Sequence, residues 1–189
     1  MKNQITQNPQ AGDLLISEPF LQDENFSRSV VLLCEHNEEG SFGLVLNKPS
    51  ILRLNEIVDG MDFLDAEVYV GGPVEQNTLH FVYVGEKKIE GSIKIGEQLW
   101  WGGDFQELVE ALRLGLIQVE TIRFFLGYSG WAPDQLQEEL SENVWIICQS
   151  EINPDTLANT PEELWRSLLK NMGGEFKVIA NYPPDPRLN

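Results

Sequence analysis

The stretch from Gly127 to Leu140, GYSGWAPDQLQEEL, constrains the fold more than any other part of this chain. It follows the apolar run Thr121–Leu126, which is typical of a buried strand. Its glycines permit a tight turn, and Pro133 has the φ angle that suits the first turn of a helix. Beyond it, Leu136 and Leu140 lie four residues apart and share one helical face. The stretch therefore predicts a strand, a glycine turn and a helix that begins at Pro133.

Two interpretations of this turn are open. In the first, Tyr128 and Trp131 are structural wedges that hold the helix against the sheet. In the second, the turn binds a ligand, because backbone N–H groups point out of glycine turns and helix N-termini. We favour the wedge, since a strand, glycines, a tryptophan and a proline-started helix form a corner first. Neither interpretation establishes a reaction.

The remaining strand-like runs come in adjacent pairs, which predicts antiparallel hairpins. The clearest hairpin joins Ser29–Cys34 to Phe42–Leu46 through a polar loop that ends at Gly40. Further strands are expected at residues 13–17, 67–70, 79–84, 93–99, 144–148 and 176–180, the last as an edge strand. Helices are expected at residues 52–58, after the capping residue Asp104 with an apolar face that reaches Leu116, and from Pro161 onward. Paired strands with single helices between them favour an α+β fold.

A length of 189 residues with 42% hydrophobic residues is typical of one globular domain. We assign residues 1–10 to a flexible tail, residues 11–189 to a single domain, and residues 182–186 to a rigid extended tail. No apolar run is long enough to span a membrane, and residues 1–10 lack the apolar core of a signal peptide. These features predict a cytoplasmic protein with no membrane partner.

The chain is strongly acidic, with 13 Lys and Arg against 30 Asp and Glu and a net charge of −17. Such a field repels nucleic acid and anionic lipid. The sole adjacent basic pair is Lys87–Lys88, and no helix-turn-helix, zinc finger or basic arm is visible. We therefore expect no direct binding of nucleic acid, and a protein partner of basic character.

The thiols and histidines do not form a recognisable catalytic or metal-binding motif. Cys34 and His36 lie two apart on a predicted strand, so they share a face, and a Cys–His pair can serve as nucleophile and base. Parallel side chains on one strand are poorly placed for proton transfer, so a buried thiol beside a turn histidine is the preferred interpretation. Cys148 also ends an apolar run, and His80 has no second ligand nearby in sequence. We predict no catalytic group, no metal site and no cofactor.

Three turns that each follow a strand are the better candidates for a ligand site: Asn47–Pro49, Gly71–Pro73 and Gly127–Trp131. If the strand ends converge, these turns line one pocket. Lys48 would then supply a cation, Asn47 and Gln135 amide contacts, and Trp131 a stacking face. The alternative is that the glycine turns serve packing only. The candidate ligand-binding residues are Asn47, Lys48, Gly71, Gly72, Pro73, Gly127, Tyr128, Ser129, Gly130, Trp131 and Gln135.

Four segments, in this order, resemble the AlgH/YqgE family of bacterial proteins. They are GDLLISEP (12–19) with FSRSVVLLCEH (26–36), GLVLNKP (43–49), VGGPV (70–74), and FLGYSGW (125–131) with Gln135–Leu136 and Glu139–Leu140. The resemblance implies an α+β fold in which a mostly antiparallel sheet is bent into a pseudo-barrel with flanking helices. It also implies a bacterial cytosolic protein. It implies no activity, although some members carry the label of transcriptional regulator from a link to alginate production.

Together these observations predict a non-enzymatic cytosolic protein that acts in regulation or protein interaction. Any effect on transcription would be indirect, since nothing in the chain favours DNA contact. The alternative is a small-molecule-binding protein, or an enzyme, that uses a pocket at the glycine turns.

Overall fold

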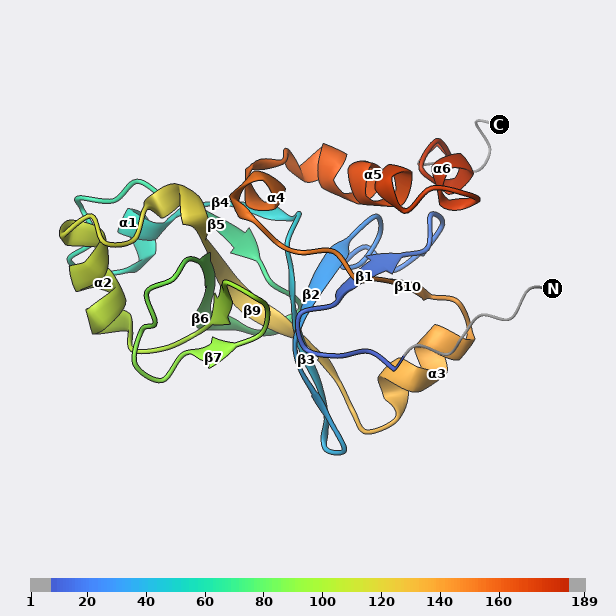
Figure 1. Ribbon diagram of the computed structural model, residues 1–189, viewed down its shortest axis with the longest axis horizontal. Coiled ribbons are helices and arrows are strands. Elements are labelled where there is room, and N and C mark those ends of the chain that lie inside the picture. Colours follow the sequence, from blue (N-terminus) through green and yellow to red (C-terminus); the bar gives the residue numbers. More distant parts are fainter. Residues whose placement is uncertain (1–7, 184–189) are drawn as a thin grey trace.

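The computed structural model describes residues 8–183 (Figure 1). The tails expected at residues 1–10 and 182–186 therefore fall largely outside the described residues. The strands are β1 (Leu14–Ser17), β2 (Val30–Asn37), β3 (Gly40–Val45), β4 (Pro49–Arg53), β5 (Glu67–Val70), β6 (Val74–Val84), β7 (Ile93–Lys94), β8 (Leu99–Trp101), β9 (Ile122–Trp131) and β10 (Trp145–Cys148). The helices are α1 (Leu54–Ile57), α2 (Phe105–Arg113), the 3₁₀ turn η1 (Val119–Thr121), α3 (Gln135–Ser141), α4 (Pro154–Ala158), α5 (Pro161–Met172) and α6 (Phe176–Ile179).

The strands form one bent, mostly antiparallel sheet in the order β10-β1-β2-β3-β9-β6-β8-β7, with β5 beside β9 and β4 beside β5. Within residues 8–183, the β5–β9 ladder is the parallel one. The predicted α+β class is confirmed, with a sheet that is bent but not closed into a barrel. The predicted hairpin is also confirmed, as β2 and β3.

Strand β9 crosses the middle of the molecule and belongs to both halves of the sheet (Figure 1). Its first half pairs with β5 and β6, and its last residues, Ser129–Trp131, pair with β3. The predicted turn at Gly127–Trp131 is thus wrong: the strand continues through it. The bend lies at Gly127, which has a left-handed φ of +68° that favours glycine.

The half of the sheet that contains β1, β2, β3 and β10 is covered on both faces. Because side chains alternate along a strand, Leu14 and Ile16 face helix α5, whereas Leu15 faces α3. Figure 1 shows α5 and α3 on opposite sides of these strands. The other half of the sheet packs its outer face on α1 and α2, and its inner face on the core beneath α5.

Several helix boundaries differ from the sequence predictions. Helix α3 begins at Gln135 rather than Pro133, because Asp134 is its N-cap residue with a φ of +66°. Asp104 does cap α2, since its carboxylate accepts a hydrogen bond from the Glu107 N–H at 2.8 Å. That helix ends at Arg113, however, so Leu116 is 59% exposed and does not belong to its apolar face.

The edge strand predicted at residues 176–180 is wrong, because Phe176–Ile179 forms helix α6. Its apolar residues Phe176, Ile179 and Ala180 lie three and four apart and pack on the core beneath α5. A short apolar run of this kind fits a helix or a strand equally well. Its packing beside α5, rather than beside a free strand edge, decides the outcome.

Candidate functional site

The three turns proposed as a ligand site, Asn47–Pro49, Gly71–Pro73 and Gly127–Trp131, meet in part. Lys48, Pro49 and Gly72 line one small cavity of about 210 Å³, and Gly72 lies against the Tyr128 backbone. Trp131 and Gln135 do not line this cavity, because Trp131 faces the core beneath α3. The turns Asn47–Pro49 and Gly71–Pro73 therefore share a cavity, whereas the end of Gly127–Trp131 lies apart from it.

Gly71, Gly72 and Gly127 allow the backbone of Gly71–Pro73 to pack directly against the backbone of β9. A Cβ on Gly71 would lie 2.3 Å from the Gly127 carbonyl oxygen, and one on Gly127 would lie 2.7 Å from that of Gly72. The Gly71 carbonyl accepts hydrogen bonds from the Val45 N–H at 2.9 Å and from the buried Ser129 hydroxyl at 3.0 Å. The backbone groups at this crossing are thus engaged with each other. Of the remaining predicted residues, Pro73 and Gly130 are exposed.

Trp131 lies where a structural wedge should lie. It is 6% exposed and meets the Trp145 ring edge-on, with ring centroids 5.9 Å apart. Glu139 accepts hydrogen bonds from the indole N–H groups of both tryptophans, at 2.8 and 2.7 Å, on the same carboxylate oxygen. Its other oxygen accepts from the Gln135 side chain at 2.9 Å. Gln135 is therefore part of the support for helix α3.

A cluster of four half-buried rings lies where the two halves of the sheet meet; we call it the aromatic cluster. Its members come from four strands and are Phe42, His80, Trp101 and Tyr128. Phe42 stacks on Tyr128 at 4.6 Å between centroids and lies 4.7 Å from Trp101. His80 meets both Phe42 and Tyr128 at an angle, at 5.2 and 5.9 Å. In this cluster, Tyr128 offers the partly exposed aromatic face that the sequence analysis expected from Trp131.

The side chain of His80 lies within hydrogen-bonding distance of Thr78. The Thr78 hydroxyl donates its single proton to the Glu75 carbonyl at 2.8 Å and lies 3.0 Å from His80 Nε2. A proton on Nε2 of the neutral ring would complete this contact by donating to the Thr78 hydroxyl. Burial lowers the pKa of His80, and the charge of Glu75 opposes this shift. Burial thus favours the neutral form of the His80 ring within the cluster.

Cationic side chains converge on a second, larger cavity of about 540 Å³, which we call the cationic pocket. Its charged lining residues are Arg28, Lys48, Arg166 and Glu162. The apolar part of the lining is supplied by Pro49, Pro161 and Trp165. For a chain of net charge −17, a concentration of three cations is unusual.

Asn47 borders the same cavity but has a positioning role. Its carbonyl oxygen accepts from the Val30 N–H at 2.9 Å. Its amide donates to the carbonyl oxygens of Arg28 at 2.9 Å and Pro161 at 3.2 Å. These three bonds join the start of β2 to the start of α5, which sets the distance between two walls of the pocket. The side-chain amide of Asn47, a predicted ligand contact, is thus engaged in hydrogen bonds within the chain.

Cys34 and His36 are not a catalytic pair in this structure. A β-bulge between Leu33 and Glu35 interrupts the alternation of the strand. Cys34 is 2% exposed, whereas His36 is exposed and its Nδ1 lies 2.7 Å from the Ser41 hydroxyl. Burial raises the pKa of the Cys34 thiol well above its usual value, which disfavours the nucleophilic thiolate.

We expect both thiols to react slowly in the native protein. Cys34 and Cys148 are free and buried, and burial raises the pKa of each. Native protein mixed with a chromogenic disulfide reagent should therefore show little thiol release, and guanidinium should expose both groups. Rapid native labelling of Cys34 would contradict this assignment and restore the nucleophile as a candidate.

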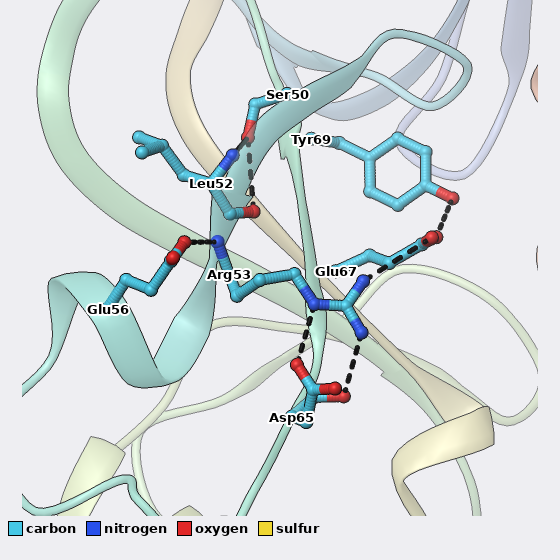
Figure 2. Close-up of polar contacts among 7 residues, drawn as sticks. All are labelled: Ser50, Leu52, Arg53, Glu56, Asp65, Glu67 and Tyr69. Carbon is cyan, nitrogen blue, oxygen red and sulfur yellow. Dashed lines mark hydrogen bonds and ion pairs between the residues drawn. The ribbon is translucent and has the colours of Figure 1, made fainter.

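Arg53 organises an exposed polar cluster between β4 and β5 (Figure 2). Its guanidinium lies 2.6 Å from Asp65 and 3.6 Å from Glu67, and the Tyr69 hydroxyl donates to Glu67 at 3.1 Å. The hydrogen bond from Arg53 lowers the pKa of Asp65. A carboxylate held ionised by an arginine is poorly suited to general acid catalysis. The cluster thus links two strands at the edge of the sheet.

The described residues contain neither a side-chain cluster suited to a metal ion nor a helix suited to crossing a membrane. No group of three His, Cys, Asp or Glu side chains among them could hold a metal ion. Among the described helices, none is both long and apolar enough to cross a membrane.

Sequence reasoning identified Lys48 and Tyr128 but missed their partners. Arg28 and Arg166 are far apart in the chain and meet through the packing of α5 on the sheet. Phe42 and His80 similarly meet through the central strand. One local feature of the sequence does single out Arg28. This charged residue lies directly before a buried strand, where a charge needs a specific environment.

Comparisons with known proteins agree over nearly the whole chain. A family model described as AlgH-like matches residues 14–177. A UPF0301 protein of Cytophaga hutchinsonii is 46% identical over 94% of this chain and 98% of the relative. A second, from Chlorobium luteolum, is 41% identical over 95% of this chain and 94% of the relative.

Solved structures give the same result for the fold. The solution structure of the AlgH protein from Pseudomonas aeruginosa has a TM-score of 0.69 and 29% identity, and the match covers 97% of this chain and 98% of that one. A crystal structure of a Corynebacterium diphtheriae protein has a TM-score of 0.77 at 21% identity, with 93% and 94% covered. The latter likeness concerns the fold alone.

Proposed function

The chain belongs to the AlgH-like family, and from this premise we propose that it is a non-catalytic interaction protein that binds a basic segment of a protein partner. The observation that carries the proposal is the aromatic cluster of Phe42, His80, Trp101 and Tyr128. Any influence on transcription is then indirect, exerted through the partner.

The aromatic cluster has the composition of an interaction hot spot. Tyrosine and tryptophan are enriched at the centres of protein interfaces, where their rigid rings bury a large area at low entropic cost. The rings come from β3, β6, β8 and β9, and those of Phe42, Trp101 and Tyr128 pack against the core beneath α5. They are therefore held in place before a partner arrives, which reduces the cost of binding.

The charge around the cluster favours a basic partner. Glu35 is exposed and pairs with Phe42 across the β2–β3 ladder, and Glu75 is close enough to His80 to influence its pKa. The whole chain adds a net charge of −17. Lysine and arginine side chains are attracted to aromatic faces as well as to carboxylates, so a basic segment satisfies both features.

A cytoplasmic location forms part of the proposal. Cys34 and Cys148 are free thiols, which is typical of a reducing compartment. The alternative function, a small molecule held at the glycine turns, is less well supported, because those turns are closed by strand-to-strand backbone contacts. An enzyme is also less well supported, since Cys34 is buried at a bulge in β2 whereas His36 is exposed.

The test is a native pull-down that compares three tagged proteins: wild type, Tyr128→Ala and Phe63→Ala. Phe63 is an aromatic residue that is 45% exposed and lies outside the aromatic cluster, so it is the matched control. We expect a partner that is retained by wild type and Phe63→Ala and lost by Tyr128→Ala. With the purified partner, Tyr128→Ala should weaken binding by about 30-fold, the effect of a hot-spot residue of about 2 kcal/mol.

Affinity for the purified partner should also fall as salt rises, because the attraction is partly electrostatic. Equal loss of the partner in both variants, or a partner segment that is acidic, would contradict the proposal. So would a salt-sensitive complex with duplex DNA at micromolar protein, since the proposal includes no direct contact with nucleic acid.

A further inference from the structure

The residues that line the cationic pocket carry more positive than negative charge. Three cations and one carboxylate line it, Arg28, Lys48 and Arg166 against Glu162, which leaves two net positive charges. The cations come from three separate segments: the loop before β2, the turn between β3 and β4, and helix α5. The fold therefore brings like charges together, at an electrostatic cost that an anionic ligand would offset.

Arg28 is held under strain at this site. Its φ of +50° lies in the left-handed region, which is costly for a residue other than glycine. Its guanidinium lies 4.6 Å above the Trp165 ring and donates to the Tyr182 carbonyl at 2.6 Å. Its Nε is buried and has no hydrogen-bond partner within residues 8–183. A buried donor without an acceptor is unfavourable, so an acceptor atom of a ligand that reaches Nε would relieve this cost.

Arg123 offers a comparison for Arg28, because it is a buried arginine that bonds to backbone carbonyl oxygens of the chain. It is 5% exposed, and its two terminal nitrogens donate to the carbonyl oxygens of Leu46, at 2.6 Å, and Leu157. Its guanidinium also covers the Tyr69 ring at 4.2 Å. Arg28 differs from Arg123 because a second cation, Arg166, is close enough to lower the pKa of Arg28 further after burial has lowered it.

Lys48 completes the group. Its ammonium nitrogen donates to the Glu24 carbonyl at 2.5 Å, which leaves two further protons available for hydrogen bonds. Burial lowers the pKa of Lys48, and the nearby carboxylates Asp23 and Glu24 oppose that shift. Lys48 also borders the smaller cavity at Gly72, so it lies between the two.

We propose that the cationic pocket binds the phosphate group of a small phosphorylated molecule. A phosphate monoester carries about −1.5 to −2 charges at pH 7, which matches the two net positive charges of the lining, whereas a carboxylate carries one. Arginine and lysine are the side chains that recognise phosphate oxygens. A volume of about 540 Å³ is far larger than one phosphate ion needs and is within the usual range for small-molecule sites. The rings of Pro49 and Pro161 offer apolar contact for the organic remainder.

The test is calorimetric titration of the full chain at low salt with phenyl phosphate, inorganic phosphate and acetate. We expect saturable binding of phenyl phosphate that is at least tenfold tighter than that of acetate, because two net charges face one. Lys48→Gln and Arg166→Gln should each weaken phenyl phosphate by about tenfold or more, as expected for loss of a hydrogen bond to a charged group. Glu162→Gln should strengthen binding several-fold, because it removes the carboxylate that opposes the anion.

Lys170→Gln is the matched control. Lys170 is exposed on the same helix α5, lies outside the pocket, and loses the same charge on substitution. Its effect should be less than about twofold, since Lys170 does not line the pocket and solvent screens the charge of an exposed side chain that makes no direct contact with the ligand. Equal effects of Lys170→Gln and Arg166→Gln would overturn the proposal, because the attraction would then reflect net charge alone.

Equal affinity for acetate and phenyl phosphate, or no saturable binding of either phosphate, would also overturn it. Equal affinity for inorganic phosphate and phenyl phosphate would support the phosphate subsite and assign it to the free ion. Thermal unfolding of each variant checks its folding, and the gain expected for Glu162→Gln cannot arise from misfolding. The inference is independent of the aromatic cluster, so Tyr128→Ala should bind phenyl phosphate like wild type.

Discussion

Trp131→Ala should lower the free energy of unfolding by about 3–5 kcal/mol, as truncation of a large aromatic residue in a core does. Trp131 is 6% exposed and belongs to the core between the sheet and helix α3. The substitution removes its packing on Trp145 and one of the donors to the half-buried Glu139 carboxylate. A typical domain is stable by about 5–15 kcal/mol, so a large fraction of the total is at stake.

Urea denaturation followed by circular dichroism measures this effect. Trp131→Phe separates the two contributions, because it retains most of the packing and removes the N–H that Glu139 accepts. Leu116→Ala is the surface control: Leu116 is 59% exposed, so a change within about 0.5 kcal/mol is expected. A near-neutral Trp131→Ala would show that the ring is a ligand-stacking face rather than a wedge.

The elements that the sequence predicts well are those whose signals are local. The hairpin of β2 and β3 has a β-branched run, a polar loop with glycine and a returning apolar run. Helices α2 and α5 have capping residues, Asp104 and Thr160, before an apolar stripe. In each case the residues that decide the structure lie within one turn or one hairpin of each other.

The errors occur where contacts distant in sequence decide the backbone. Glycines at Gly127 and Gly130 predict a turn, but pairing with β5, β6 and β3 keeps the chain extended across both halves of the sheet. The run at residues 176–180 is too short for its period to distinguish helix from strand, and its packing beside α5 makes it helical. Tertiary packing thus overrides local signals at these positions.

Contacts between residues distant in sequence matter even more for the candidate sites than for the fold. Lys48 is recognisable because it lies in a proline turn after a strand, yet its charge matters through Arg28 and Arg166, which reach it only in the folded chain. Tyr128 is likewise recognisable beside the glycines, whereas its stacking partner Phe42 comes from another strand. A sequence pattern can therefore nominate one member of each site, and the topology supplies the others.

Gly127→Ala should strongly destabilise this protein, because the added methyl group meets both a left-handed backbone and a close approach. Gly127 has a φ of +68°, where alanine carries a backbone penalty of about 1–2 kcal/mol. The added Cβ would also lie 2.7 Å from the Gly72 carbonyl oxygen and 2.8 Å from that of Val74. Val74 begins β6 and Gly72 lies in the short connection between β5 and β6, so both oxygens belong to backbone that packs closely on β9. We expect a loss of more than about 4 kcal/mol, or failure to fold.

Gly130→Ala is the matched control for Gly127→Ala, because it adds the same methyl group to the same strand. Gly130 has no left-handed φ, and its Cβ would approach only the edge of the Tyr128 ring, at 3.2 Å. The half-buried ring needs to move by only a few tenths of an ångström, and alanine lowers the entropy of the unfolded chain by an amount worth about 0.4–1 kcal/mol. The stability of Gly130→Ala in urea should therefore lie within about 1 kcal/mol of wild type. Similar losses at both positions would show that the strand is sensitive to any side chain, and that the close approach at Gly127 is not what bends the sheet.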